Sequence, residues 1–183
     1  LMFRDSFGNT LLPFFANEFE KACFSKGTPY AIEEYMNTQN PDYVVIEKVE
    51  RNIDQLASEP PIITPVETKI KSGIQNVKSK TDLSVNKSEY NMMYLTLGGK
   101  IDNKYIKTDS KIYIRITAEG AASVYNAFGI SDDNGDNGYM LYLPCEQYSG
   151  ADSAKIEIIT AENDKYTCVK SDTVNLRKVI END

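Results

Sequence analysis

Apolar and polar residues change their spacing partway along the chain. In residues 1–58, short apolar runs alternate with segments whose apolar residues recur at helical intervals, as in residues 11–19. Residues 43–46 form a continuous apolar run bounded by polar residues, which is typical of a strand buried on both faces of a parallel sheet. This alternation of strand and helix predicts an open α/β sheet.

Two local signals refine the first half. Leu1-Met2-Phe3 predicts the end of a buried strand, followed by turn-like residues and a helix. Thr28 is a candidate N-cap, with Pro29 at the first position of a helix that runs through Tyr35. Three strands and their helices within residues 1–58 would leave sheet edges and one face uncovered. We therefore expect this part to be a fragment of a larger α/β domain.

Beyond residues 59–65, which hold three of the seven prolines, the hydrophobic period becomes two. Residues 111–117 and 155–158 alternate cleanly, and shorter strands are predicted at 92–97, 104–107, 122–128, 139–143 and 166–170. Turn residues, including Gly98-Gly99 and Glu162-Asn163-Asp164, separate them. We expect residues 1–58 to be the α/β part, 59–65 a linker and 66–183 an all-β antiparallel sandwich.

Composition and charge narrow the classes of partner. The formal net charge is −7, and acidic and basic residues are interspersed, so a nucleic-acid interface and an anionic membrane surface are poor expectations. No run approaches the length of a membrane span, and no cofactor motif is found. Cys23, Cys145 and Cys168 form no CxxC pair. We interpret them as buried apolar side chains, with a Cys145–Cys168 bridge as the alternative.

Ser6 is the candidate nucleophile. It follows the first predicted strand and precedes a helix, so its hydroxyl is expected at an exposed turn. The amides of Phe7 and Gly8 would lie near it and are candidates for an oxyanion hole. Asp5 would point away from Ser6. The alternative is a helix start in which Asp5, Ser6 or Asn9 is only the N-cap.

The chain has no histidine, so it lacks the usual base for a serine nucleophile. Nevertheless, residues 1–9 (LMFRDSFGN), 12–14 (LPF) and 41–52 (PDYVVIEKVERN) resemble the serine block and the following strand and helix of SGNH hydrolase-like proteins of the AlgX/AlgJ and DHHW type. The resemblance implies a flavodoxin-like sheet and acyl-ester chemistry on bacterial cell-surface polysaccharide. It also implies an extracellular or cell-surface location. In that family an Asp-x-His block precedes the serine.

This resemblance predicts that the chain belongs to an O-acyltransferase or esterase and is inactive alone. Its partners would be a polysaccharide or an acyl-donor protein. The alternative is a β-sandwich module that binds carbohydrate or protein without a catalytic role. Nine of the twelve tyrosines lie beyond residue 59, but tyrosine is also a favoured strand residue, and we interpret most of them as structural.

One loop carries hard oxygen ligands. Asp132, Asn134 and Asp136 match the first three ligand positions of an EF-hand calcium loop. The sixth position is Asn137 and the twelfth is Leu143, so the match is weak. We interpret the segment as an exposed turn and expect no metal site, with calcium as the alternative.

Overall fold

The computed structural model describes residues 1–71, 73–107, 109–131 and 136–181. The chain divides into two compact units, Leu1–Ile63 and Thr64–Asp183, and the division falls within the proline-rich segment 59–65. Among the described residues, no helix has the length and apolar character needed to cross a membrane.

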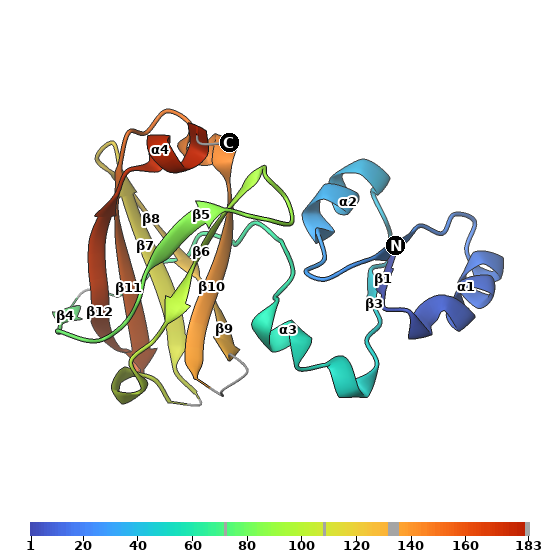
Figure 1. Cartoon of the computed structure of the whole chain (residues 1–183), viewed down its shortest axis with the longest axis horizontal. Helices are drawn as coiled ribbons and strands as arrows, with labels where there is room; N and C mark the ends of the chain where they lie inside the picture. The colour runs from blue at the N-terminus through green and yellow to red at the C-terminus, as the bar shows by residue number, and fades with distance from the viewer. Residues whose placement is uncertain (72, 108, 132–135, 182–183) are drawn as a thin grey trace. The chain divides into compact units, whose positions relative to one another are not determined.

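The first unit contains a small parallel sheet with short helices (Figure 1). Its strands are β1 (Met2–Arg4), β2 (Phe24–Lys26) and β3 (Val45–Ile46). Their order is β2-β1-β3, and β1 runs parallel to both neighbours. The helices are the 3-10 turns η1 (Phe7–Leu11) and η2 (Glu50–Asn52) and the α-helices α1 (Leu12–Glu18), α2 (Ile32–Gln39) and α3 (Gln55–Ser58). The predicted parallel α/β arrangement is confirmed.

The core of this unit is built on the central strand. Phe3 is fully buried and packs with Tyr30 and Ile32. The ring of Tyr35, from α2, meets the Phe3 ring edge-on with centroids 5.6 Å apart. Because β1 has a hydrogen-bonded neighbour on each side, its position is fixed by backbone pairing as well as by side-chain packing.

Two expectations for the first unit are wrong. The run at residues 43–46 is not buried on both faces: Tyr43 is 67% exposed, and Val44 and Ile46 are also exposed. Only Val45–Ile46 of this run forms a strand, β3, which lies at the edge of the sheet and pairs with β1 alone among the described strands. Helix α2 has Ala31 as its N-cap, so Thr28 and Pro29 belong to the preceding loop.

The second unit contains two sheets that are largely antiparallel. One has four strands in the order β5-β6-β10-β9, and the other has five in the order β4-β12-β11-β7-β8. The strands are β4 (Gln75–Asn76), β5 (Ser84–Lys87), β6 (Tyr94–Lys100), β7 (Lys111–Ala118), β8 (Ala121–Asn126), β9 (Phe128–Ser131), β10 (Asn137–Pro144), β11 (Ala154–Glu162) and β12 (Lys165–Val174). Among the described strands of this second unit, only β4 and β12 pair in parallel.

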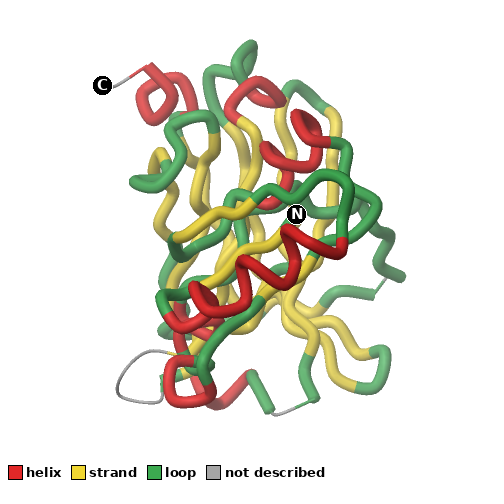
Figure 2. Tube along the Cα trace, turned by 90° about the vertical axis from the view of Figure 1, so that its right-hand side faces the viewer, coloured by secondary structure: helices red, strands yellow, loops and turns green. Residues whose placement is uncertain are grey.

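Short helical segments complete this unit; Figure 2 draws helices in red and strands in yellow for the whole chain. They are η3 (Asn103–Tyr105), η4 (Cys145–Tyr148) and α4 (Leu176–Glu181). Helix α4 lies across one end of the strands in Figure 1.

The two sheets share one hydrophobic core. Leu97 of β6 and Leu141 of β10 come from the four-stranded sheet, while Ile114 of β7 and Ile158 of β11 come from the five-stranded sheet. All four are buried, as the alternating pattern of the strands predicts. A second, smaller cluster, which includes Tyr113 and Tyr166, covers part of the five-stranded sheet on its other face.

Two expectations for the second unit are wrong. Gly98 and Gly99 lie inside β6, paired with β10, and form no turn. Glycine is required there because a Cβ on Gly99 would lie 2.5 Å from the carbonyl oxygen of Asp82. Residues 104–107 do not form a strand, since the 3-10 turn η3 ends at Tyr105. Strands β4 and β5 and helix α4 lie where the sequence analysis predicts no element.

All three cysteines are free thiols, so the alternative of a Cys145–Cys168 bridge is wrong. Cys145 begins η4, directly after a strand of the four-stranded sheet. Cys168 is buried on the five-stranded sheet, on the face opposite the shared core. Burial raises the pKa of the Cys168 thiol, which disfavours the reactive thiolate.

Candidate functional site

The candidate site lies at the carboxyl ends of the three parallel strands. Ligands of open α/β sheets bind at this edge, because the loops that follow parallel strands converge there. Strand β1 leads to Ser6, β2 leads to Thr28, and β3 leads to Glu47 and Lys48. Three segments far apart in sequence therefore deliver polar side chains to one edge.

Ser6 lies in the turn between β1 and η1. Its side chain is exposed, its backbone is in the right-handed helical region (φ −69°, ψ −19°), and it makes no side-chain capping bond to η1. Within the described part of the chain, no hydrogen bond engages its hydroxyl. The hydroxyl is thus free to meet a ligand, which is the first requirement for a nucleophile.

Asp5 organises the turn that carries Ser6. Its Oδ1 accepts a hydrogen bond from the Phe7 amide at 2.8 Å, and its Oδ2 accepts one from the Val49 amide at 2.9 Å. Together with the Gly8 amide, these donors hold the pKa of Asp5 below its ordinary value, and the Val49 amide contributes most. The Asp5 carboxylate is therefore a structural acceptor and does not face Ser6 as a base.

Gly8 permits close packing behind the turn. It is buried, and a Cβ at this position would lie 2.5 Å from Glu47 Oε2 and 2.8 Å from the Cβ of Arg4. Glu47 also accepts a hydrogen bond from the Asp5 amide through Oε2, at 3.2 Å. The turn after β1 and the loop after β3 are thus linked in both directions.

The same edge carries two cations. Lys48 donates a hydrogen bond from Nζ to Thr28 Oγ1 at 2.9 Å, and Nζ lies 5.8 Å from the centre of the Tyr30 ring. The guanidinium carbon of Arg51 lies 4.5 Å from the centre of the Phe7 ring, which is half exposed. The edge thus carries charges of both signs, since the carboxylates of Asp5 and Glu47 lie there too. The two cations are the groups that could meet an anionic substrate group or a developing oxyanion.

The structure brings together only some of the residues expected in the site. Ser6, Phe7 and Gly8 lie in one turn, as predicted. However, the Phe7 amide already donates to Asp5, so it can serve an oxyanion only by exchanging that bond. Glu50 lies in the first turn of η2, where the helix dipole favours a negative charge.

Sequence reasoning missed the roles of Glu47, Lys48 and Thr28. The signal was present, because polar residues follow each predicted strand of the parallel sheet and such positions converge at one edge. What the sequence does not give is the pairing of individual atoms, such as Lys48 Nζ with Thr28 Oγ1.

No metal centre is found in the described part of the chain, since no group of three or more Cys, Asp or Glu side chains is placed to hold an ion. Of the weak calcium candidates, Asp132 and Asn134 lie outside the described residues. Asp136 is described, and its carboxylate pairs with Lys100 Nζ at 2.9 Å.

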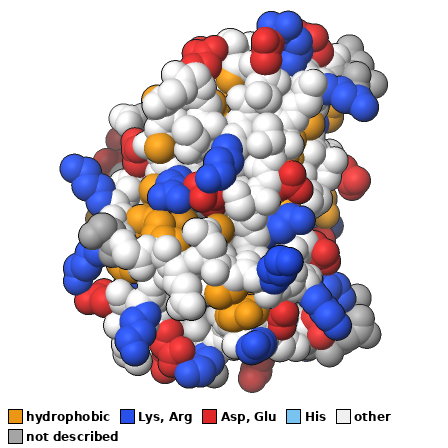
Figure 3. Space-filling model, turned by 90° about the vertical axis from the view of Figure 1, so that its left-hand side faces the viewer, with side chains coloured by type: hydrophobic (Ala, Val, Ile, Leu, Met, Phe, Trp, Pro, Cys, Tyr) orange, Lys and Arg blue, Asp and Glu red, His pale blue; other side chains and the backbone are white. Residues whose placement is uncertain are grey.

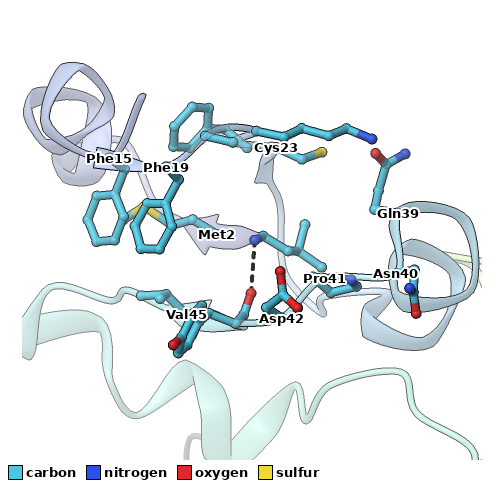
Figure 4. Close-up of a pocket in the computed structure, with 14 residues that line it drawn as sticks. Met2, Phe15, Phe19, Cys23, Gln39, Asn40, Pro41, Asp42 and Val45 are labelled. Carbon is cyan, nitrogen blue, oxygen red and sulfur yellow. Dashed lines mark hydrogen bonds between the residues drawn. The ribbon is translucent and has the colours of Figure 1, made fainter. Parts of the chain in front are cut away.

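A pocket of about 140 Å³ lies at the opposite, amino-terminal edge of the same sheet (Figure 4). Phe15 and Phe19 stack over one side of it, with ring centroids 5.9 Å apart, and Met2 and Val45 lie at the starts of their strands. The pocket is thus separated from Ser6 by the length of β1, and we do not assign the serine chemistry to it.

Comparison with known proteins identifies no relative: no family model matches the chain, and no curated protein matches it.

Proposed function

We propose that the first unit carries the nucleophile of an SGNH-like O-acyltransferase or esterase that acts on cell-surface polysaccharide. The observation that supports this most is the position of Ser6. It is exposed and free of hydrogen bonds among the described residues, two residues after the end of the buried central strand of a parallel sheet. The small sheet would then be one part of a larger flavodoxin-like sheet, and the two antiparallel sheets would form an accessory sandwich.

In the proposed reaction, Ser6 Oγ attacks the carbonyl carbon of an acyl ester while a base removes the hydroxyl proton. The tetrahedral intermediate collapses, the alkoxide of the leaving group takes up the proton, and the acyl group remains on Ser6. Water or a sugar hydroxyl then removes the acyl group by the reverse steps. The Phe7 and Gly8 amides, once released from Asp5, would stabilise the oxyanion.

The base must come from outside these 183 residues, because the chain contains no histidine. No other described side chain is hydrogen-bonded to the Ser6 hydroxyl. We therefore propose that the chain alone does not turn over an ester, and that an Asp-x-His segment of the same protein or of a partner completes the site.

The experiment is to isolate the protein from its own cell, determine its intact mass and N-terminal sequence, and assay release of acetate from acetylated polysaccharide. We expect a mass above 20.6 kDa, an Asp-x-His segment ahead of Ser6, and activity that Ser6→Ala abolishes. Ser149→Ala, in the second unit, is the control. Activity that survives Ser6→Ala, or a native protein that contains no histidine and binds no histidine-bearing partner, would refute the proposal.

A further inference from the structure

A polar pocket of about 360 Å³ lies in the second unit, beside the turn that joins β11 to β12. Its volume is in the range of small-molecule sites, which span roughly 300–1,000 Å³. Three lysines line it, Lys104, Lys107 and Lys165, against one acidic residue, Glu162. The pocket is therefore locally basic in a chain whose formal net charge is −7.

Two of the three lysines are available to a ligand. Lys107 pairs with Glu162 at 2.7 Å, but both side chains are largely exposed, so this pair contributes little and is readily exchanged. Lys104 and Lys165 form no ion pair with any described residue. Lys104 Nζ lies 5.4 Å from the centre of the Tyr105 ring, which places a positive charge beside an aromatic wall.

Three hydroxyl-bearing residues, Ser110, Thr160 and Thr167, are among those that line the pocket. Thr160 of β11 lies opposite Thr167 of β12, and Glu162 lies opposite Lys165. By strand alternation, positions 160 and 162 share the face of Ile158, which points into the core. Along this face of β11, the apolar side chain of Ile158 is therefore followed by Thr160 and Glu162, which line the pocket.

From these features we infer that the pocket binds an anionic saccharide, a sugar ring that carries a carboxylate or a sulfate. The lysines would bind the anionic group, the threonine hydroxyls would bind sugar hydroxyls, and the Tyr105 ring would pack against the apolar face of the ring. Basic and acidic side chains are interspersed on the face drawn in Figure 3. The pocket, by contrast, is lined by three lysines and one acidic residue. This inference is independent of any reaction at Ser6.

The test is calorimetric titration of the full chain with four probes: an oligogalacturonate, a heparin-derived oligosaccharide of similar length, a neutral malto-oligosaccharide and inorganic sulfate. We expect saturable binding of at least one anionic oligosaccharide, weakening as NaCl is raised, and at least about tenfold weaker binding of the neutral sugar and of sulfate. The preferred probe distinguishes a carboxylate from a sulfate as the recognised group.

Variants locate the binding site. The double variant Lys104→Gln/Lys165→Gln should weaken binding of the preferred probe by about tenfold or more, because it removes both unpaired charges. Lys178→Gln, on the exposed surface of α4, removes one charge elsewhere in the same unit and should leave binding unchanged. Failure of both anionic oligosaccharides to saturate, equal affinity for inorganic sulfate or for the neutral sugar, or a double variant equal to wild type would overturn the inference.

Discussion

The carboxylate of Asp5 accepts a hydrogen bond at 2.9 Å from the amide of Val49, 44 residues further along the chain. With its other oxygen it accepts one from the Phe7 amide. One side chain therefore fixes the turn that carries Ser6 to the loop that follows β3. The geometry of the candidate site depends on this link rather than on the short sheet alone.

Replacing Asp5 by Ala should loosen both loops. The amide of Val49 loses its acceptor and becomes accessible to water, so its hydrogen exchange should become faster. The measurement is residue-resolved exchange by NMR, with Asp42→Ala as a control because the Asp42 side chain is exposed. Unchanged protection of Val49 in Asp5→Ala would show that the link does not hold the loop.

The hydrogen bond from the Val49 amide to Asp5 should make the protection of that amide depend on pH. The folded pKa of Asp5 lies below its ordinary value, so the stabilisation is present above the unfolded pKa and is lost as pH falls through the folded pKa. Protection of the Val49 amide should therefore decline below about pH 4 in the wild type. In Asp5→Asn, which has no carboxylate, it should not vary with pH in that window. A wild-type carboxyl titration at or above the ordinary value would contradict this account.

Gly8→Ala should strain the serine turn. The added methyl group would meet Glu47 Oε2 and the Cβ of Arg4, and a backbone shift that relieves such crowding costs about 1–3 kcal/mol. The measurement is thermal unfolding of the first unit, followed by the NMR amide signals of β1. Gly150→Ala is the matched control, because a Cβ there would meet nothing within 4 Å. Equal stability of the two variants would mean that the turn adjusts without cost.

In the second unit, Glu157 is 4% exposed and accepts hydrogen bonds from Arg115 at 2.6 Å and Lys155 at 3.0 Å. Glu157→Gln should lower the free energy of unfolding by about 1–3 kcal/mol at neutral pH, because charge-assisted hydrogen bonds are lost. Glu89→Gln, at an exposed position, should have no measurable effect.

The pH dependence of the stability loss in Glu157→Gln separates the loss of the carboxylate charge from a packing defect. The hydrogen bond from Arg115 is the main cause that holds the pKa of Glu157 below its ordinary value. The stabilisation is therefore full above the unfolded pKa and is lost as pH falls through the folded one. The stability difference between wild type and Glu157→Gln should shrink as pH is lowered from about 6 to about 3. A difference that stays constant would show that the carboxylate charge does not contribute.

Much of the fold could be predicted from the period of the apolar residues. The parallel first sheet and the largely antiparallel second unit follow from it, because strands and helices bury their side chains at different intervals. The failures have tertiary causes. Gly98-Gly99 has the composition of a turn, but the pair lies within β6, and Gly99 is small because the backbone at Asp82 approaches it closely. Residues 43–46 are as apolar as a central strand, yet only Val45–Ile46 forms a strand, which lies at the sheet edge, and Tyr43 and Val44 are exposed.

The candidate site could be predicted only to the level of single positions. Residues 1–9 predict the position of Ser6, because a strand end followed by a helix start defines an exposed turn. The hydrogen bond between Asp5 and Val49 could not be predicted from the sequence. It joins two loops through one carboxylate and depends on the order of the strands in the sheet. The lysine pocket was missed because Lys104 and Lys165 are far apart in sequence and meet only in the folded unit.

The central claim is that Ser6 is a nucleophile whose base lies outside these 183 residues. The most direct measurement is fluorophosphonate labelling, mapped by peptide mass spectrometry, on the 183-residue chain and on the protein isolated from its own cell. We predict no label on Ser6 in the chain and stoichiometric label on Ser6 in the native protein. Stoichiometric labelling of Ser6 in the chain, or none in the folded native protein, would contradict the claim.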